Sequence, residues 1–309
     1  MSITAISASK SPLLGAPTVS TQWLCDHIGS DSIVVLDATV LSVLAFGGDR
    51  VWLSGLDEYL VNGHIPGALF ADVIETLSDP DRPFGFARPS AERFSAAVTQ
   101  LGIGPSTTVI VYDNSLGQWA ARVWWLFRSF GHDQVAVLDG GLTKWNLEDR
   151  PTETGYVEPT VALEAFVAEE RHGFWVEKPF VEDVVAGRVD ALLLCALPPK
   201  EFSGETGSRE RRGHIPGSVN VAAGRLVDPE THAMLPKSAL RGAFAAVLEG
   251  RADGSRAAAD DRIVVYCGGG IAAAADALAL AALGEYNVAV YDGSLNEWSA
   301  DPAAPLLSL

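Results

Sequence analysis

The feature that most constrains this chain is an internal repeat with a long period. Three segments recur in the same order at a nearly constant offset. They are GHIPGA at 63–68 and GHIPGS at 213–218, VIVYD at 109–113 and IVVYC at 263–267, and LDGGL at 138–142 and YDGSL at 291–295. Three collinear matches indicate a duplicated domain, and the period is far too long for a solenoid of short repeats.

Each half alternates short apolar runs with stretches of helical spacing. The apolar runs are short and continuous, as expected for strands buried on both faces; they lie at 33–36, 108–112 and 134–138, and again at 191–194, 263–266 and 288–291. Helices are predicted at Trp119–Phe130 and at Ile271–Leu283, where Gly284 ends the helix. The alternation predicts an α/β fold in which each domain has a mainly parallel sheet flanked by helices.

The composition of the middle of the chain suggests where the domains meet. Residues 151–172 contain prolines, a glycine and several glutamates without a clear period, which predicts a linker. We therefore expect an N-terminal domain at 1–150 and a C-terminal domain at 173–309. The segment Asp79–Pro89, rich in Pro, Asp and Gly, is predicted to be a surface connection inside the first domain.

Charge and cysteine content narrow the possible partners. The chain has 309 residues and a formal net charge of -17, which would repel nucleic acids and anionic membrane surfaces but still allows a small anionic substrate. No apolar run is long enough to span a membrane, and the N-terminus lacks the pattern of a signal peptide. Three widely spaced cysteines, Cys25, Cys195 and Cys267, predict neither a disulfide framework nor a metal site, and favour a cytoplasmic location.

Cys267 occupies the position with the clearest chemical meaning. It follows a predicted buried strand and precedes Gly268, Gly269, Gly270 and a predicted helix. In an open parallel sheet, active sites form at the carboxyl ends of the strands. The unpaired N–H groups at a helix N-terminus stabilise a thiolate, and the glycines let these groups approach the sulfur. The order of residues therefore indicates a nucleophilic cysteine in an anion-binding loop.

Other uses of such a loop are excluded by the neighbouring residues. A phosphatase of the C-x5-R type needs an arginine six positions after the cysteine, where this chain has Ala273. A P-loop motif is absent, and Cys267 has no CxxC partner for thioredoxin-like redox chemistry. His64 and His214 in the two GHIPG turns are predicted to be structural. Asp139 and Asp292, each before a glycine at a strand end, are predicted to hold turns through local hydrogen bonds.

Taken together, these motifs resemble the tandem-domain rhodaneses, the family of thiosulfate and 3-mercaptopyruvate sulfurtransferases. The resemblance runs from Ser20 to Trp298 and rests on the paired GHIPG segments, WWLFRSFGH at 124–132, LDGG followed by Trp145, and VVYCGGG at 264–270. It implies two tandem rhodanese-like α/β domains, of which the C-terminal one is catalytic. The N-terminal domain is expected to be silent, because Asp113 stands where the other domain has Cys267.

The resemblance also implies a mechanism. The Cys267 thiolate would take sulfane sulfur from a small donor, hold it as a persulfide and pass it to cyanide or a thiol. The active-site loop would comprise Gly268, Gly269, Gly270, Ile271 and Ala272. No metal or organic cofactor is expected.

Some positions depart from the family pattern. Mercaptopyruvate enzymes resemble C-G-S-G-V-T at the loop, whereas this chain has C-G-G-G-I-A without the two hydroxyls. Glu201 replaces a family arginine that binds the donor's anionic group, and Arg209, Arg211 and Arg212 are the nearby candidates for that task. These departures leave open a second interpretation, a weakly active or non-enzymatic protein that carries or binds persulfide sulfur. The sequence leaves the donor, the acceptor and the oligomeric state open.

Overall fold

The framework consists of two parallel sheets, one from each half of the chain. The computed structural model describes residues 14–44, 50–248 and 262–309; most of the N-terminal segment that lacks a signal-peptide pattern lies outside them. In the described residues the first sheet has the order β1-β7-β6-β2-β5 and the second β10-β9-β11-β12-β8. All pairings within both sheets are parallel, as the sequence predicts.

The strands of the first sheet are β1 (Thr18–Val19), β2 (Ile33–Asp37), β5 (Leu69–Phe70), β6 (Thr108–Tyr112) and β7 (Val135–Leu138). Those of the second are β8 (Trp175–Val176), β9 (Ala191–Cys195), β10 (Val219–Asn220), β11 (Arg262–Tyr266) and β12 (Val288–Tyr291). The central strands β6 and β11 are almost entirely buried, which explains their uninterrupted apolar sequences. An antiparallel hairpin of β3 (Val40–Leu44) and β4 (Arg50–Ser54) was not expected from the sequence.

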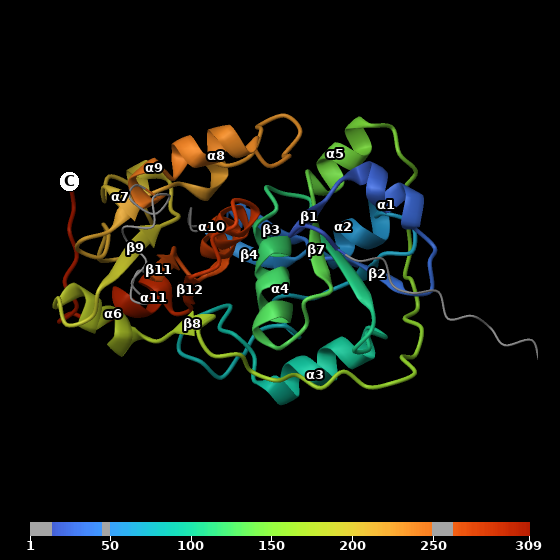
Figure 1. Ribbon diagram of the computed structural model, residues 1–309, viewed down its shortest axis with the longest axis horizontal. Helices are drawn as coiled ribbons and strands as arrows, with labels where there is room; N and C mark the ends of the chain where they lie inside the picture. The colour runs from blue at the N-terminus through green and yellow to red at the C-terminus, as the bar shows by residue number, and fades with distance from the viewer. Residues whose placement is uncertain (1–13, 45–49, 249–261) are drawn as a thin grey trace, which may run out of the picture.

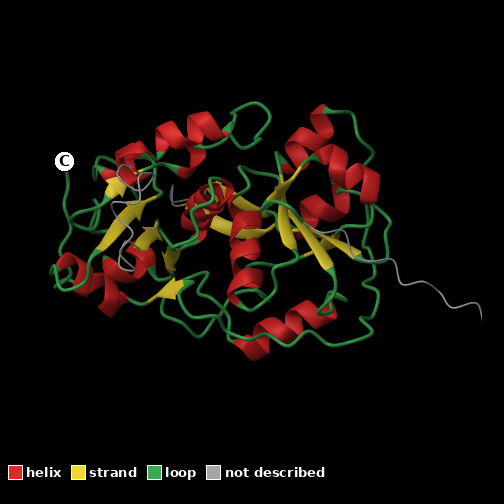
Figure 2. Cartoon of the chain, viewed as in Figure 1, coloured by secondary structure: helices red, strands yellow, loops and turns green. Residues whose placement is uncertain are grey.

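Helices cover both sheets (Figures 1 and 2). In the first half they are α1 (Thr21–His27), α2 (Leu56–Val61), α3 (Ala91–Gln100), α4 (Gln118–Ser129) and α5 (Gly141–Leu147). In the second they are α6 (Lys178–Val185), α7 (Pro199–Phe202), the 3₁₀ turn η1 (Ala223–Arg225), α8 (Lys237–Ala243), α9 (Ala245–Leu248), α10 (Ile271–Ala282) and α11 (Ser294–Trp298). The predicted helices at 119–130 and 271–283 correspond to α4 and α10.

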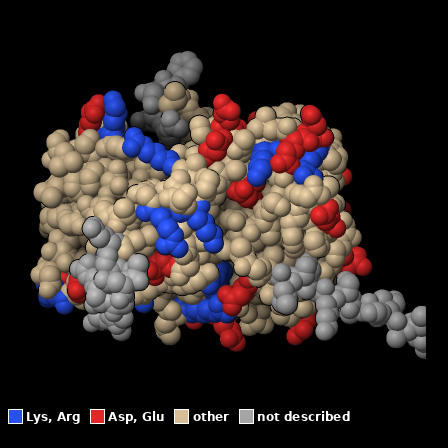
Figure 3. Space-filling view, turned by 45° about the horizontal axis from the view of Figure 1, so that its top comes forward, with Lys and Arg blue, Asp and Glu red and all other residues tan. Residues whose placement is uncertain are grey.

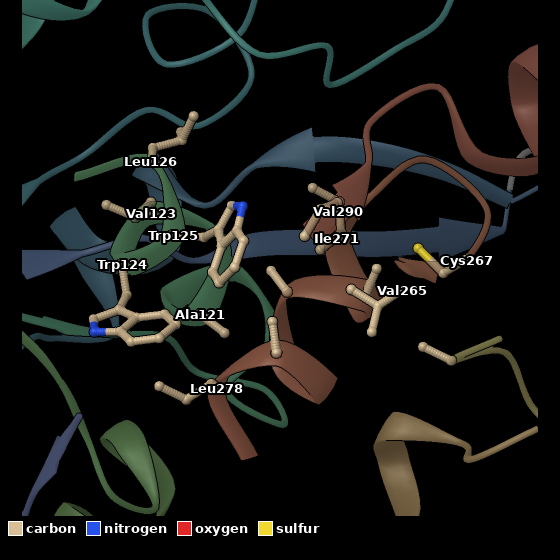
Figure 4. Packing of buried hydrophobic residues seen from close by; sticks show 14 of the residues in the cluster. Ala121, Val123, Trp124, Trp125, Leu126, Val265, Cys267, Ile271, Leu278 and Val290 are labelled. Carbon is tan, nitrogen blue, oxygen red and sulfur yellow. The ribbon is translucent and has the colours of Figure 1, made fainter. Parts of the chain in front are cut away.

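The two halves meet through α4 and α10, which lie between the sheets in Figure 1. Both helices are buried on nearly every face. Figure 4 shows Trp124 and Trp125 of α4 beside Ile271 and Leu278 of α10, with Cys267 at the edge of this apolar cluster. Each helix begins at the end of the central strand of its own sheet, so the two loops that precede them face the same interdomain region.

The sequence repeat is matched by repeated hydrogen bonds. In each half the isoleucine of the HIPG turn donates its backbone N–H to the hydroxyl oxygen of the tyrosine that ends the central strand. The distance is 3.2 Å from Ile65 to Tyr112 and 3.1 Å from Ile215 to Tyr266. The histidines of these turns are buried and stacked on aromatic rings of the preceding helices. These contacts support a structural role for both histidines.

Candidate active site

Cys267 lies at the carboxyl end of β11, and the residues that follow the neighbouring strand β12 fix its backbone. Its N–H donates to Ser294 Oγ at 3.1 Å, and its carbonyl oxygen accepts from the N–H of Leu295 at 3.1 Å. Ser294 has φ +46°, an uncommon left-handed conformation for a non-glycine residue. Strain of this kind persists only where the surroundings enforce it, often at functional sites. The Cys267 side chain is buried, with only 3% of the residue exposed.

The loop after Cys267 presents backbone N–H groups. Gly270 has φ +79° and forms the N-cap of α10, so Ile271 and Ala272 are the first residues of the helix. Among the described residues no protein acceptor binds the N–H groups of Gly269, Gly270, Ile271 and Ala272. N–H groups at a helix N-terminus are a favourable environment for an anion. The predicted loop residues are therefore together around the end of the strand.

The N-terminal domain shows what an equivalent loop does with an anion. Asp113 follows β6 as Cys267 follows β11, and it is 1% exposed. One carboxylate oxygen accepts from the N–H groups of Ser115 (2.8 Å) and Gly117 (3.0 Å), and the other from those of Trp119 and Ala120 (2.9 Å each). The repeat thus contains a cradle already filled by its own carboxylate. The loop after Cys267 is one residue shorter, because the N-cap of α10 is Gly270, three residues after Cys267, whereas that of α4 is Gly117, four residues after Asp113.

Of the three candidate arginines, Arg209 lies at the loop. A Cβ atom added to Gly268 would overlap Arg209 Nη2, so the guanidinium touches the glycine backbone. Arg209 Nε donates to Asn296 Oδ1 at 3.2 Å, and Arg209 Nη1 is 3.8 Å from Glu201 Oε2. Glu201 therefore partly neutralises the charge of Arg209 at the loop.

Arg211 and Arg212 are placed differently. The guanidinium of Arg211 donates to the carbonyl oxygens of Ser299, Asp301 and Ala304, so its donors hold the C-terminal segment. Arg212 is exposed. Of the three arginines, we therefore expect Arg209, rather than Arg211 or Arg212, to contact an anion at the loop.

The predicted surface connection at 79–89 reaches the other domain, which sequence reasoning did not anticipate. Phe86 Cδ2 is 3.8 Å from where a Cβ of Gly269 would lie, and the N–H of Arg88 donates to Asp292 Oδ2 at 2.8 Å. The local-turn prediction for Asp292 is therefore wrong, because its carboxylate binds the other domain. Phe86 has φ +61°, and no signal in the sequence marked it.

A mirrored contact joins the domains at the N-terminal loop. Asp139 Oδ1 accepts from the N–H of Met234 at 2.7 Å, and His232, with φ +57°, places its ring Nδ1 2.6 Å from the carbonyl oxygen of Ser115. The local-turn prediction for Asp139 is thus incomplete: Asp139 also pairs locally with Lys144 but reaches across the interface as well. Each domain covers the strand-end loop of the other.

The other two cysteines differ from Cys267 in position. Cys195 ends β9 and is fully buried, and burial raises the pKa of its thiol to about 12. It therefore stays a protonated thiol at neutral pH, although its strand lies next to β11. Cys25 is half-buried on α1, far along the chain from the loop.

Asp276 of α10 is fully buried, and neither of its carboxylate oxygens has a hydrogen-bond partner among the described residues. Burial raises the pKa of this carboxyl well above its usual range. The folded protein therefore holds a proton that the unfolded chain releases above about pH 4. By linkage, the contribution of Asp276 to stability is present below that pH and is lost as pH rises.

Replacing Asp276 with alanine should consequently stabilise the protein near pH 8. We expect the free energy of unfolding to rise by about 1–2 kcal/mol, because an unpaired buried polar group is removed from a helix that then gains its best helix former. Urea unfolding at pH 8 and pH 5 measures this, and the gain should be smaller at pH 5. An equal gain at both pH values would contradict a protonated Asp276.

In the described part of the chain, no group of three or more His, Cys, Asp and Glu side chains is arranged to hold a metal ion. None of the helices there combines the length and the hydropathy that crossing a bilayer requires.

Figure 3 shows a group of Lys and Arg side chains near the middle of one face, despite the net charge of -17.

Comparison with known proteins supports these observations. The rhodanese-like domain model matches residues 20–148 and 187–301. A 3-mercaptopyruvate sulfurtransferase of Escherichia coli (strain K12) is 36% identical over 294 residues, covering 93% of this chain and 96% of the relative. A thiosulfate sulfurtransferase of Gallus gallus is 31% identical over 293 residues, covering 92% and 94%. The crystal structure of SseA from Escherichia coli, a 3-mercaptopyruvate sulfurtransferase, has a TM-score of 0.75 at 34% identity and covers 90% of this chain and 98% of its own.

Fold and site together define a duplicated α/β protein with a buried cysteine between the central strand β11 and the glycine turn that begins α10. The chain belongs to the rhodanese family of sulfurtransferases. The two matched segments each contain four of the five strands of one parallel sheet, while β1 and β8 lie before them.

Proposed function

We propose that this protein transfers sulfane sulfur from a small donor to cyanide or a thiol through a persulfide on Cys267. The observation that carries the proposal is the comparison between the two strand-end loops. Where the N-terminal loop binds the Asp113 carboxylate, the C-terminal loop has Cys267, followed by Gly269 and Gly270, whose N–H groups have no acceptor among the described residues. The N-terminal domain is silent because its cradle holds a carboxylate that cannot carry sulfur.

The proposed reaction has two steps of nucleophilic catalysis. The Cys267 thiolate attacks the sulfur of 3-mercaptopyruvate; an S–S bond forms and the donor's C–S bond breaks. The electron pair of that bond leaves with the carbon fragment, which takes up a proton and becomes pyruvate. A cyanide or thiolate acceptor then attacks the outer sulfur and restores the Cys267 thiolate. The loop N–H groups stabilise the negative charge on sulfur in both states.

Charge at the loop favours a donor with one negative charge. Thiosulfate carries two, while the loop is contacted by Arg209, whose charge Glu201 partly offsets. At about 4 Å and an effective dielectric constant near 20, one like-charge pair costs about 4 kcal/mol before screening. Even a quarter of this energy, about 1 kcal/mol, corresponds to about a fivefold loss in binding. We therefore propose that 3-mercaptopyruvate, or another donor of low charge, is used with a higher kcat/KM than thiosulfate.

The proposed function is tested by giving the protein each donor and measuring two quantities. Intact mass spectrometry after incubation with 3-mercaptopyruvate should show the addition of one sulfur atom, which cyanide then removes. Steady-state assays should give the higher kcat/KM for 3-mercaptopyruvate. Loading without turnover would support the alternative of a persulfide carrier, and no loading by either donor would contradict both.

Replacing Arg209 with methionine should lower kcat/KM for 3-mercaptopyruvate by about tenfold, mainly through KM, because the cation at the loop is lost.

Glu201→Gln should raise kcat/KM for thiosulfate by about three- to tenfold, since the repelling charge is removed. Arg188→Met is the matched control, because Arg188 also pairs with a carboxylate, that of Asp183, in the same half of the chain. Unchanged kinetics in both site variants would show that another group binds the donor.

A further inference from the structure

Arg122 belongs to α4 in the N-terminal half of the chain, and its guanidinium lies at the active-site loop of the other half. The residue is 1% exposed. Its Nη2 donates to Asp292 Oδ1 at 2.6 Å and to the carbonyl oxygen of Phe86 at 2.7 Å. Its guanidinium carbon lies 4.7 Å from the centroid of the Trp175 ring. Arg122 therefore ties the loop that covers the active site to the strand end beside it.

The second terminal nitrogen of Arg122 faces the active-site loop itself. Nη1 is buried and has no hydrogen-bond partner among the described residues. A Cβ atom at Gly270 would lie 3.0 Å from this nitrogen, so Nη1 is close to the loop backbone. Buried donors without partners are rare and costly in folded proteins, so one at this position calls for a functional reason.

The two halves of the molecule differ at this point although they are otherwise built alike. Arg122 is the fifth residue after Gly117, the N-cap of α4; the fifth residue after Gly270, the N-cap of α10, is Ala275. At the loop of Asp113, the aspartate equivalent to Asp292 pairs instead with Lys144, a quarter-exposed residue of its own half. The buried arginine from the other domain is present beside Cys267 and absent beside Asp113.

We propose that Arg122 is a positioning residue of the sulfur-transfer site, supplied by the catalytically silent domain. It holds Phe86 and Asp292 against the active-site loop, and its buried charge stabilises the anionic sulfur of Cys267. The inference rests on the proposed function. A charge in this low-dielectric environment acts more strongly on the sulfur than the same charge in water would.

Because Arg122 and Asp292 have opposite charges, removing one or the other should have opposite effects on the Cys267 thiol. The test measures the alkylation rate of Cys267 by iodoacetamide against pH, without a sulfur donor, in a Cys25→Ser background. Arg122→Met should raise the pH midpoint by about half a unit or more, and Asp292→Asn should lower it by a similar amount. Both should lower Tm, since each breaks a buried ion pair. A merely structural role would move the midpoint in the same direction in both variants.

The other ionisable groups near the loop stay constant across these variants. They are Arg209 with Glu201, Asp276 on α10, Cys195 on β9, Tyr266 on β11, and Arg88 with Glu170 and Glu177. Lys144→Met, which breaks the equivalent pair at the N-terminal loop, is the matched control and should leave the midpoint unchanged. Arg122→Lys should keep the midpoint near that of the wild type but lower kcat/KM, because one ammonium group cannot take both the place of Nη2, between Phe86 and Asp292, and the place of Nη1 at Gly270.

Opposite shifts in the two single variants would support the proposal. Shifts of the same sign, or no shift in either, would overturn it. Should Arg122→Met fail to fold, Asp292→Asn decides alone, since it keeps the shape of the side chain and a downward shift is required. Alkylation needs no sulfur donor, so this result is separate from the mass measurement that tests sulfur transfer.

Discussion

Replacing Cys267 with serine is expected to abolish sulfur loading and to lower sulfurtransferase turnover by about a thousandfold or more. A serine hydroxyl at the end of β11 would meet the same N–H groups but cannot form a persulfide. The effect should be seen in two measurements, the mass gain after incubation with 3-mercaptopyruvate and the steady-state rate with cyanide as acceptor.

The two remaining cysteines serve as controls for this prediction. Cys25→Ser should still load one sulfur, because Cys25 lies on α1 away from the loop. Cys195→Ser, on the neighbouring strand, should likewise still load one sulfur, because burial raises the pKa of the Cys195 thiol to about 12 and keeps this thiol protonated. Sulfur loading that survives Cys267→Ser would disprove the assignment.

Removing the carboxylate of Asp113 should cause a large loss of the free energy of unfolding. Asp113 accepts hydrogen bonds from four N–H groups and the Ser115 hydroxyl within its loop. In Asp113→Ala these donors lose their acceptor in a buried place, and each buried unpaired group costs about 1–3 kcal/mol. Allowing for relaxation, we expect the free energy of unfolding to fall by about 3–5 kcal/mol, as measured by urea denaturation.

Asp113→Asn provides the graded control. It keeps the shape and one acceptor oxygen, so its loss of stability should be about half as large. A loss below 1 kcal/mol in Asp113→Ala would mean that the loop rearranges freely and that its N–H groups are not a fixed anion cradle. The corresponding argument for Cys267 would then lose its main support.

Several parts of this molecule could be predicted from local sequence because their causes are local. Buried strands such as Val288–Tyr291 follow from continuous apolar runs. The order of strand, Cys267, glycines and helix is encoded within a few residues, and the repeat of the chain makes the two parallel sheets a direct expectation. The family resemblance then predicted the chemistry of the site.

Other features required knowledge of how distant residues meet. The sequence pattern placed three arginines near the site without distinguishing them, and the structure shows Arg209 at Gly268 while Arg211 holds C-terminal carbonyls. Their side chains are long and flexible, so neighbouring positions along the chain can point to unrelated places. The segment at 79–89 has the composition of an ordinary loop, and its role depends on what it is packed against.

The sequence by itself thus predicted the duplicated α/β architecture, which the structure confirms, and it pointed to Cys267 as the nucleophile and to Asp113 as its counterpart, since each is set by periodicity, nearest neighbours or the repeat. Only the tertiary structure decided how the two domains share one site. Arg122 and Asp292 are 170 residues apart and form a buried pair because α4 packs against the other domain. No local signal encodes such a contact: its energy depends on burial and on the partner's position, and both exist only after the chain has folded.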